Sequence, residues 1–334
     1  MKTTRSVRII LLICLATVTC AAAQPSGRPG PWRLFGDWQV KVQFGERQMD
    51  AIIAFSRDSE SNLTAQWIGA WGVTDLKDVK FEENKLSFVQ TVQFRENEFT
   101  STFTGAIEEG KLTGTLSSDR GESKVEGQRA PRIPRAVGDW EVKFRIGERD
   151  VTTTLALRAN KEGQLTGEWQ SQWGEHKITD LAYERGNLTF KRNSKFQDRE
   201  MESTFEGTLR GNELSGVMKS EMGEIQVEGS RVNAALIGTW NLEVVSERGT
   251  RKQRLRINPD MTGLYGTVPV KKVNVKDGKV DFLMVRQFGD QTMEMTFAGK
   301  LAESKLTGEL TTSRGTRKIT GTKVVRPSRR PRNM

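Results

Sequence analysis

The sequence contains very little cysteine and histidine. Its 334 residues include two cysteines, Cys14 and Cys20, and one histidine, His176. Iron–sulfur and structural zinc centres are held by several thiolates or imidazoles. The sequence therefore predicts no metal site of these kinds, and we expect His176 to lie in a surface loop.

Common catalytic and nucleotide-binding motifs are also missing. The chain has no G-x-G-x-x-G fingerprint, no phosphate loop and no G-x-S-x-G nucleophile turn. Its acidic residues are spread along expected outward faces. A glycosidase with paired carboxylates remains open, because such pairs come from distant strands. The favoured expectation is a non-enzymatic protein without a cofactor.

Long hydrophobic runs are absent too, and the most apolar stretch is short and N-terminal. Three basic residues precede the run Ile9–Ala16, and the small residues Ala21–Ala23 follow it. This order is typical of a secretory signal peptide, which we predict over residues 1–23. No stretch is long enough for a transmembrane helix. We expect an exported protein, periplasmic or extracellular, in a bacterium.

Both cysteines fall inside this predicted signal peptide. A chain cleaved after Ala23 has no thiol, so its domains must be stable without disulfides. Cys20 offers lipoprotein processing as an alternative. The preceding residues Thr17–Thr19 lack the leucine usual before a lipidated cysteine, which favours cleavage after Ala23.

The rest of the chain repeats itself about every hundred residues. Each copy opens with a Gly-x-Trp triplet, continues with Phe-x-Gly and Leu-x-Gly, and closes with Gly-x-Arg or Gly-x-Lys. Four landmarks in one order in three copies indicate tandem domains of one fold. We place these domains at 33–130, 136–232 and 233–325, followed by a disordered basic tail at 326–334.

Within each copy the hydrophobic period is two. Trp38, Val40, Val42 and Phe44 alternate with polar residues, and turn-rich breaks recur every 8 to 12 residues. About eight short strands and no helix are expected per copy. Such strands suit an antiparallel up-and-down β-barrel, which leaves no exposed edge. A two-sheet β-sandwich is the alternative.

In an eight-stranded meander, the first and last strands are neighbours. The early tryptophan then lies beside the terminal basic residue, whose charge can cover the indole. The three expected pairs are Trp38 with Arg129, Trp140 with Arg231, and Trp240 with Lys323. On these motifs the chain resembles the lipocalin-like, or calycin, superfamily, whose barrels are closed at one end by such a pair.

The opposite end of each barrel would be the mouth, where several aromatic residues are expected. An eight-stranded barrel either is filled by its own side chains or holds one small ligand. Arg192 and Arg286 are expected to point into their barrels. They favour a bound ligand, because a buried unpaired charge is costly. The alternatives for these arginines are a strand bulge or an internal ion pair. The resemblance likewise implies that an inward arginine meets an acidic head group. The predicted ligand contacts are Trp67, Trp71, Phe94, Phe99, Trp169, Trp173, Arg192, Phe196, Arg286 and Phe288.

Charge is distributed unevenly among the copies. The first two carry net charges of −4 and −3, whereas the third carries +7 and the tail adds four arginines. The third copy is therefore expected to contact an anionic surface such as lipid or acidic polysaccharide. The basic residues predicted for this contact are Arg251, Lys252, Arg254, Arg256, Lys271 and Lys272. Nucleic acid is disfavoured, because basic residues are not interleaved with exposed aromatics.

Two functions follow as hypotheses. The first is an exported binding protein that holds a small amphipathic or acidic ligand in its barrels. The second is a structural or adhesive cell-envelope protein with filled barrels, attached through its basic third copy. The sequence does not specify the ligand or the oligomeric state.

Overall fold

The computed structural model describes residues 34–325 except 71, 95–96, 161, 173–174, 197–198, 248 and 289–290. The predicted signal peptide and the basic tail lie outside this range. The described residues form 24 β-strands and no helix. They therefore contain no helix that could cross a membrane.

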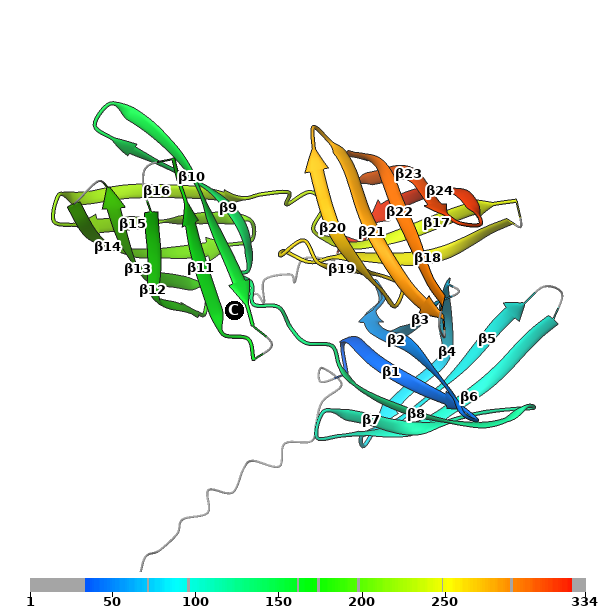
Figure 1. The fold of residues 1–334 in the computed structure, drawn as a ribbon. Coiled ribbons are helices and arrows are strands. Elements are labelled where there is room, and N and C mark those ends of the chain that lie inside the picture. The colour runs from blue at the N-terminus through cyan, green and yellow to red at the C-terminus, as the bar shows by residue number, and fades with distance from the viewer. Residues whose placement is uncertain are drawn as a thin grey trace, which may run out of the picture.

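The strands form three consecutive groups of eight (Figure 1). Barrel 1 consists of β1 (Gly36–Phe44), β2 (Arg47–Arg57), β3 (Leu63–Gly69), β4 (Gly72–Glu82), β5 (Lys85–Phe94), β6 (Asn97–Glu108), β7 (Lys111–Ser118) and β8 (Gly121–Arg129). Barrel 2 consists of β9 (Gly138–Ile146), β10 (Arg149–Ala159), β11 (Leu165–Gln170), β12 (Glu175–Glu184), β13 (Asn187–Phe196), β14 (Arg199–Arg210), β15 (Glu213–Ser220) and β16 (Gly223–Arg231). Barrel 3 consists of β17 (Gly238–Ser246), β18 (Gly249–Ile257), β19 (Gly263–Tyr265), β20 (Val268–Lys276), β21 (Lys279–Phe288), β22 (Gln291–Ala302), β23 (Lys305–Thr312) and β24 (Gly315–Lys323).

All paired strands are antiparallel neighbours in an up-and-down order. Barrels 1 and 3 are closed, with β1 paired to β8 and β17 paired to β24. In barrel 2 the ladder runs from β11 around to β12, and these two strands meet without pairing. There Ile178 packs beside Gly167, where an added Cβ would lie 3.2 Å from the Ile178 side chain. The predicted all-β barrel fold is confirmed, and the sandwich alternative is wrong.

The Phe-x-Gly and Leu-x-Gly landmarks have one structural explanation. In barrel 2, Gly207 and Gly216 are cross-strand partners on β14 and β15. The ring of Phe205 lies over both, and a Cβ on either glycine would collide with it. Phe205 in turn stacks on Phe190 at a centroid distance of 4.9 Å. Since large rings need space in a dense core, the glycine pair makes room for the aromatic stack. Barrels 1 and 3 repeat the arrangement with Phe103 and Phe297.

The Gly-x-Trp tryptophans are buried at one end of each barrel. Each indole Nε1 donates to the carbonyl oxygen four residues earlier, at 2.8, 2.9 and 2.8 Å along the chain. The chain before the first strand is thereby tied across the barrel end. The last strand places a cation opposite each indole, in the pairs Trp38–Arg129, Trp140–Arg231 and Trp240–Lys323. These cations lie 6.0, 4.1 and 5.7 Å from the ring centroids.

The three barrels do not follow one another in a row. Barrel 3 lies against barrel 1, and β18 contacts β4, although barrel 2 separates them in sequence (Figure 1). Ile52 and Ile68 mark this interface. They are cross-strand partners on the outward face of barrel 1, yet they are only 3% and 0% exposed and lie outside its core cluster. The corresponding pair in barrel 2, Thr154 and Gln170, is polar.

Candidate ligand-binding site

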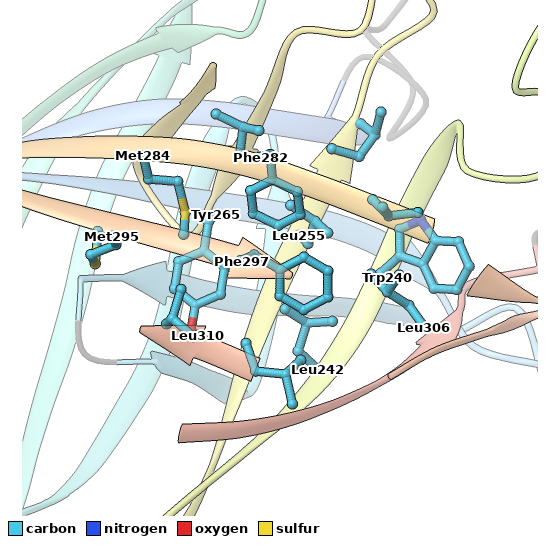
Figure 2. Packing of buried hydrophobic residues seen from close by; sticks show 14 of the residues in the cluster. Trp240, Leu242, Leu255, Tyr265, Phe282, Met284, Met295, Phe297, Leu306 and Leu310 are labelled. Carbon is cyan, nitrogen blue, oxygen red and sulfur yellow. The ribbon is translucent and has the colours of Figure 1, made fainter. Parts of the chain in front are cut away.

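Barrel 3 has a cavity at the end opposite Trp240. Figure 2 shows Trp240 on one side of the stacked rings of Phe282 and Phe297, with Met284 and Met295 on the other. Met295 lines the cavity together with Met293, and the cavity has a volume of about 550 Å³. This volume lies within the usual range of small-molecule pockets.

The cavity wall combines cationic and apolar side chains. Arginines come from β18, β21, the β23–β24 turn and β24, and no described acidic residue lines the cavity. The four arginines are Arg251, Arg286, Arg314 and Arg317. The apolar and hydroxyl-bearing lining residues are Ala70, Tyr265, Val268, Thr292, Met293, Met295, Leu310, Thr312 and Ser313. An excess of fixed positive charge beside an apolar wall favours an amphipathic anion.

Burial shapes the electrostatics of this cavity. It lowers the pKa of Arg286 below the ordinary value. It also raises the pKa of Tyr265, while the guanidinium groups of Arg251 and Arg317 act in the opposite direction. The Tyr265 hydroxyl is buried and makes no well-formed hydrogen bond to a described residue, although Arg251 is near enough to influence it. The cavity thus offers a buried hydroxyl as well as charge.

Barrel 1 supplies part of the same cavity. Ala70 lies in the turn between β3 and β4 of barrel 1 and lines the cavity in barrel 3. Beside it, the carbonyl oxygen of Gly69 accepts a hydrogen bond from Gln253 at 3.4 Å. The site is therefore built from two barrels, which the sequence did not reveal.

In barrel 2 the predicted contact Arg192 points into the barrel. Its guanidinium lies 4.7 Å from the ring centroid of Trp169, and its Nε donates to Ser203 at 3.2 Å. No described carboxylate pairs with it, and desolvation lowers its pKa to about 10. The face of Trp169 takes the place of the expected acidic partner.

The structure describes the side chains of three predicted aromatic contacts in barrels 1 and 2, namely Trp67, Trp169 and Phe99. Trp67 packs against the core of barrel 1 and Trp169 belongs to that of barrel 2. Phe99 is half-buried beneath Arg120, whose guanidinium lies 4.0 Å from its ring centroid. Trp71 and Trp173, and the side chains of Phe94, Phe196 and Phe288, lie outside the described residues.

The basic residues of the third copy do not form one exposed surface, contrary to expectation. Arg254 is buried, and with Arg256 it binds Asp37 of barrel 1. Arg251 lines the cavity, whereas Lys252 and Lys271 are exposed. The Lys272 side chain lies outside the described residues. Arg254 and Arg256 alternate with the core residues Leu255 and Ile257 and so point outward from barrel 3, but barrel 1 covers that face. The outward apolar pair Ile52 and Ile68 was the available signal.

His176 is also placed differently from expectation. It lies on β12 opposite Ser194, not in a surface loop. Its Nδ1 is 2.8 Å from the Ser194 hydroxyl and its Nε2 is 2.7 Å from the Ser171 hydroxyl. The strand begins earlier than the Trp-Gly sequence indicated, because pairing with β13 extends to Glu175.

Comparison with known proteins gives no family for this chain. No family model and no curated protein matches it. Among solved structures, a putative outer membrane protein from Bacteroides fragilis is 12% identical, with a TM-score of 0.24, covering 60% of this chain and 98% of its own. A transferrin binding protein B mutant from Haemophilus parasuis is 9% identical, with a TM-score of 0.20. The match covers 87% of this chain and 76% of that protein. A DUF3598-family protein of unknown function from Nostoc punctiforme is 11% identical, with a TM-score of 0.17. The match covers 87% of this chain and 97% of that protein. Likeness this distant supports no conclusion about ligand or partner.

Proposed function

We propose that this chain is an exported, non-enzymatic binding protein that holds a small amphipathic anion in barrel 3. The observation that carries the proposal is the set of four arginines around one cavity of about 550 Å³ without a described acidic residue in its wall. Arginine presents a planar fork that suits carboxylate, sulfate or phosphate groups. Met293, Met295 and Leu310 offer an apolar wall for a hydrocarbon part.

Arg192 in barrel 2 supports the same class of function on a smaller scale. Its charge is buried without a described carboxylate, so an anion entering barrel 2 would relieve the desolvation cost. We include Arg192 and Trp169 of barrel 2, and Trp67 at the equivalent position in barrel 1, as secondary ligand contacts. The structural or adhesive alternative is weaker, because Arg254 and Arg256 already bind Asp37.

A head-group series tests the proposal. Calorimetric titration with dodecanoate, dodecanol and dodecyltrimethylammonium keeps the twelve-carbon chain constant and changes the head group from anionic to neutral to cationic. We expect dodecanoate to bind and the cationic analogue not to bind. Arg286→Gln should weaken dodecanoate binding by about tenfold or more, since charged hydrogen bonds contribute about 1.5–3 kcal/mol.

Matched variants locate the site. Arg210→Gln removes an exposed arginine of barrel 2 and should leave binding unchanged. Arg192→Gln measures whether barrel 2 contributes to dodecanoate binding. Equal binding of all three compounds by the wild-type chain would rule out the anion pocket in barrel 3. Unchanged dodecanoate binding in Arg286→Gln would rule it out as well.

A further inference from the structure

The β19–β20 hairpin of barrel 3 is short beside the cavity. Its third strand, β19, has 3 residues, whereas β3 of barrel 1 has 7. Trp67 and Tyr265 hold equivalent positions, because they pair with Ile53 and Leu255, the partners of Trp38 and Trp240. Beyond Trp67 the β3–β4 pairing continues to Gly69 and Gly72, whereas the β19–β20 pairing ends at Tyr265 and Val268. The hairpin of barrel 3 therefore stops two residue pairs earlier at the cavity end, which leaves the wall lower there.

Gly69, Ala70 and Gly72 of barrel 1 lie beside this lower part of the wall. Gly69 accepts the hydrogen bond from Gln253, which is 2% exposed. A Cβ added to Gly72 would lie 2.8 Å from the Lys252 carbonyl oxygen, so the two backbones touch. A Cβ on Gly266 would lie 3.0 Å from the Gly69 carbonyl oxygen. Ala70, between these contacts, faces the cavity.

A second set of contacts holds the turn in place. The Asp37 carboxylate accepts bonds from Arg254 at 3.0 and 2.9 Å and from Arg256 at 2.9 Å. In barrel 2 the equivalent aspartate, Asp139, pairs instead with Arg158 of its own barrel at 2.6 Å. Barrel 1 has Ser56 at the position of Arg158, so its aspartate is satisfied by barrel 3.

We propose that Ala70, next to Gly69 at the end of β3 in barrel 1, is a specificity-determining residue in the wall of the barrel 3 pocket. Ala70 limits the length of the ligand, and docking of barrel 1 is coupled to occupancy of the pocket. This inference rests on the proposed function, since it assigns the wall of the same pocket. Coupling is reciprocal: a ligand that touches the turn binds more tightly when barrel 1 is docked, and it strengthens docking to the same extent.

The size test uses a larger side chain at the turn. Ala70→Phe should fill part of the cavity and weaken dodecanoate binding by about tenfold, while the shorter octanoate loses less. Gln172→Phe is the matched control, because Gln172 is the exposed equivalent in barrel 2 and does not line the cavity. Equal loss for both acids, or no loss for either, would overturn the assignment of Ala70.

The coupling test uses the aspartates. Asp37→Ala should weaken dodecanoate binding and increase the radius of gyration in small-angle X-ray scattering, and saturating dodecanoate should partly reverse the increase. Asp139→Ala removes the analogous ion pair inside barrel 2. It should change neither dodecanoate binding nor the radius of gyration. If Asp37→Ala expands the chain without changing dodecanoate affinity, barrel 1 is not part of the pocket.

The two proposals fail in different ways. If the wild-type chain does not bind dodecanoate, the proposed function and this inference both fall. If Arg286→Gln abolishes binding but Ala70→Phe and Asp37→Ala bind as the wild type does, only the inference falls.

Discussion

Asp37 in barrel 1 forms a bidentate ion pair with Arg254 in barrel 3, across 217 residues of sequence. Arg254 is 6% exposed, so this is a buried charge pair between two domains. Removing one partner of such a pair leaves an uncompensated charge, whereas replacing both partners with apolar groups is often tolerated.

A double-mutant cycle on this pair should show strong coupling. We expect Asp37→Leu alone to destabilise the docked state by about 3 kcal/mol, because Arg254 would be buried without its partner. Asp37→Leu combined with Arg254→Met should lose less than the sum of the single variants. Chemical denaturation monitored by tryptophan fluorescence measures all four proteins. Simple additivity would contradict a direct interaction.

The closing cation should matter more in barrel 2 than in barrel 3. Arg231 is 7% exposed and donates to the carbonyl oxygens of Arg135 and Val137, as well as to Asn212. Lys323 makes fewer contacts, mainly with Ala235 at 2.6 Å. Because buried acceptors left without donors cost about 1–3 kcal/mol each, Arg231→Met should destabilise its barrel more than Lys323→Met does. Urea unfolding of the two variants checks the order, and a larger loss for Lys323→Met would contradict it.

A methyl group beneath the aromatic stack should disrupt barrel 2. In Gly207→Ala the new Cβ would collide with the Phe205 ring and lie 2.6 Å from the Ser215 carbonyl oxygen. Overpacking of this kind costs about 1–3 kcal/mol or more. Gly211→Ala serves as a comparison for backbone strain without a collision, because its φ is 64° whereas that of Gly207 is not positive, and its Cβ would meet nothing within 4 Å. Thermal melts should show the larger decrease for Gly207→Ala. An unchanged melting temperature in Gly207→Ala would mean that the ring does not confine Gly207.

Arg192 should reduce the stability of barrel 2. Burial lowers its folded-state pKa to about 10, below the ordinary value of an arginine, so the fold disfavours the charged form. Below about pH 10 both the folded and the unfolded chain carry the charge, and the penalty is constant. Stability attributable to this group rises only above about pH 10, where the folded chain has released the proton and the unfolded chain has not.

Replacing Arg192 with an apolar residue of similar length should therefore stabilise the protein at neutral pH. We expect Arg192→Met to gain about 1–2 kcal/mol, after the loss of the contact with Trp169 is subtracted. The gain should be the same at pH 6 and pH 9. Guanidinium unfolding at both values measures it, and destabilisation would mean that the Trp169 and Ser203 contacts outweigh the desolvation.

Local patterns were sufficient to predict the barrels. Alternation with a period of two, turn residues every 8 to 12 positions and four recurring landmarks are short-range features, and each is repeated three times. The pairing of Trp140 with Arg231 followed as well, because an eight-stranded meander makes its first and last strands neighbours. The inward direction of Arg192 and Arg286 followed from the same alternation. These predictions required no knowledge of contacts between domains.

Only the tertiary structure decided how the barrels use each other. Arg254 reads as a solvent-exposed residue because it alternates with the core residue Leu255, and its partner Asp37 lies in another domain. The shortness of β19 and the contribution of Ala70 from barrel 1 to the cavity of barrel 3 were not predicted from the sequence. Strand periodicity distinguishes the inner face of a barrel from its outer face. It does not distinguish an outer face in water from one covered by a neighbouring domain, because that depends on docking between distant segments.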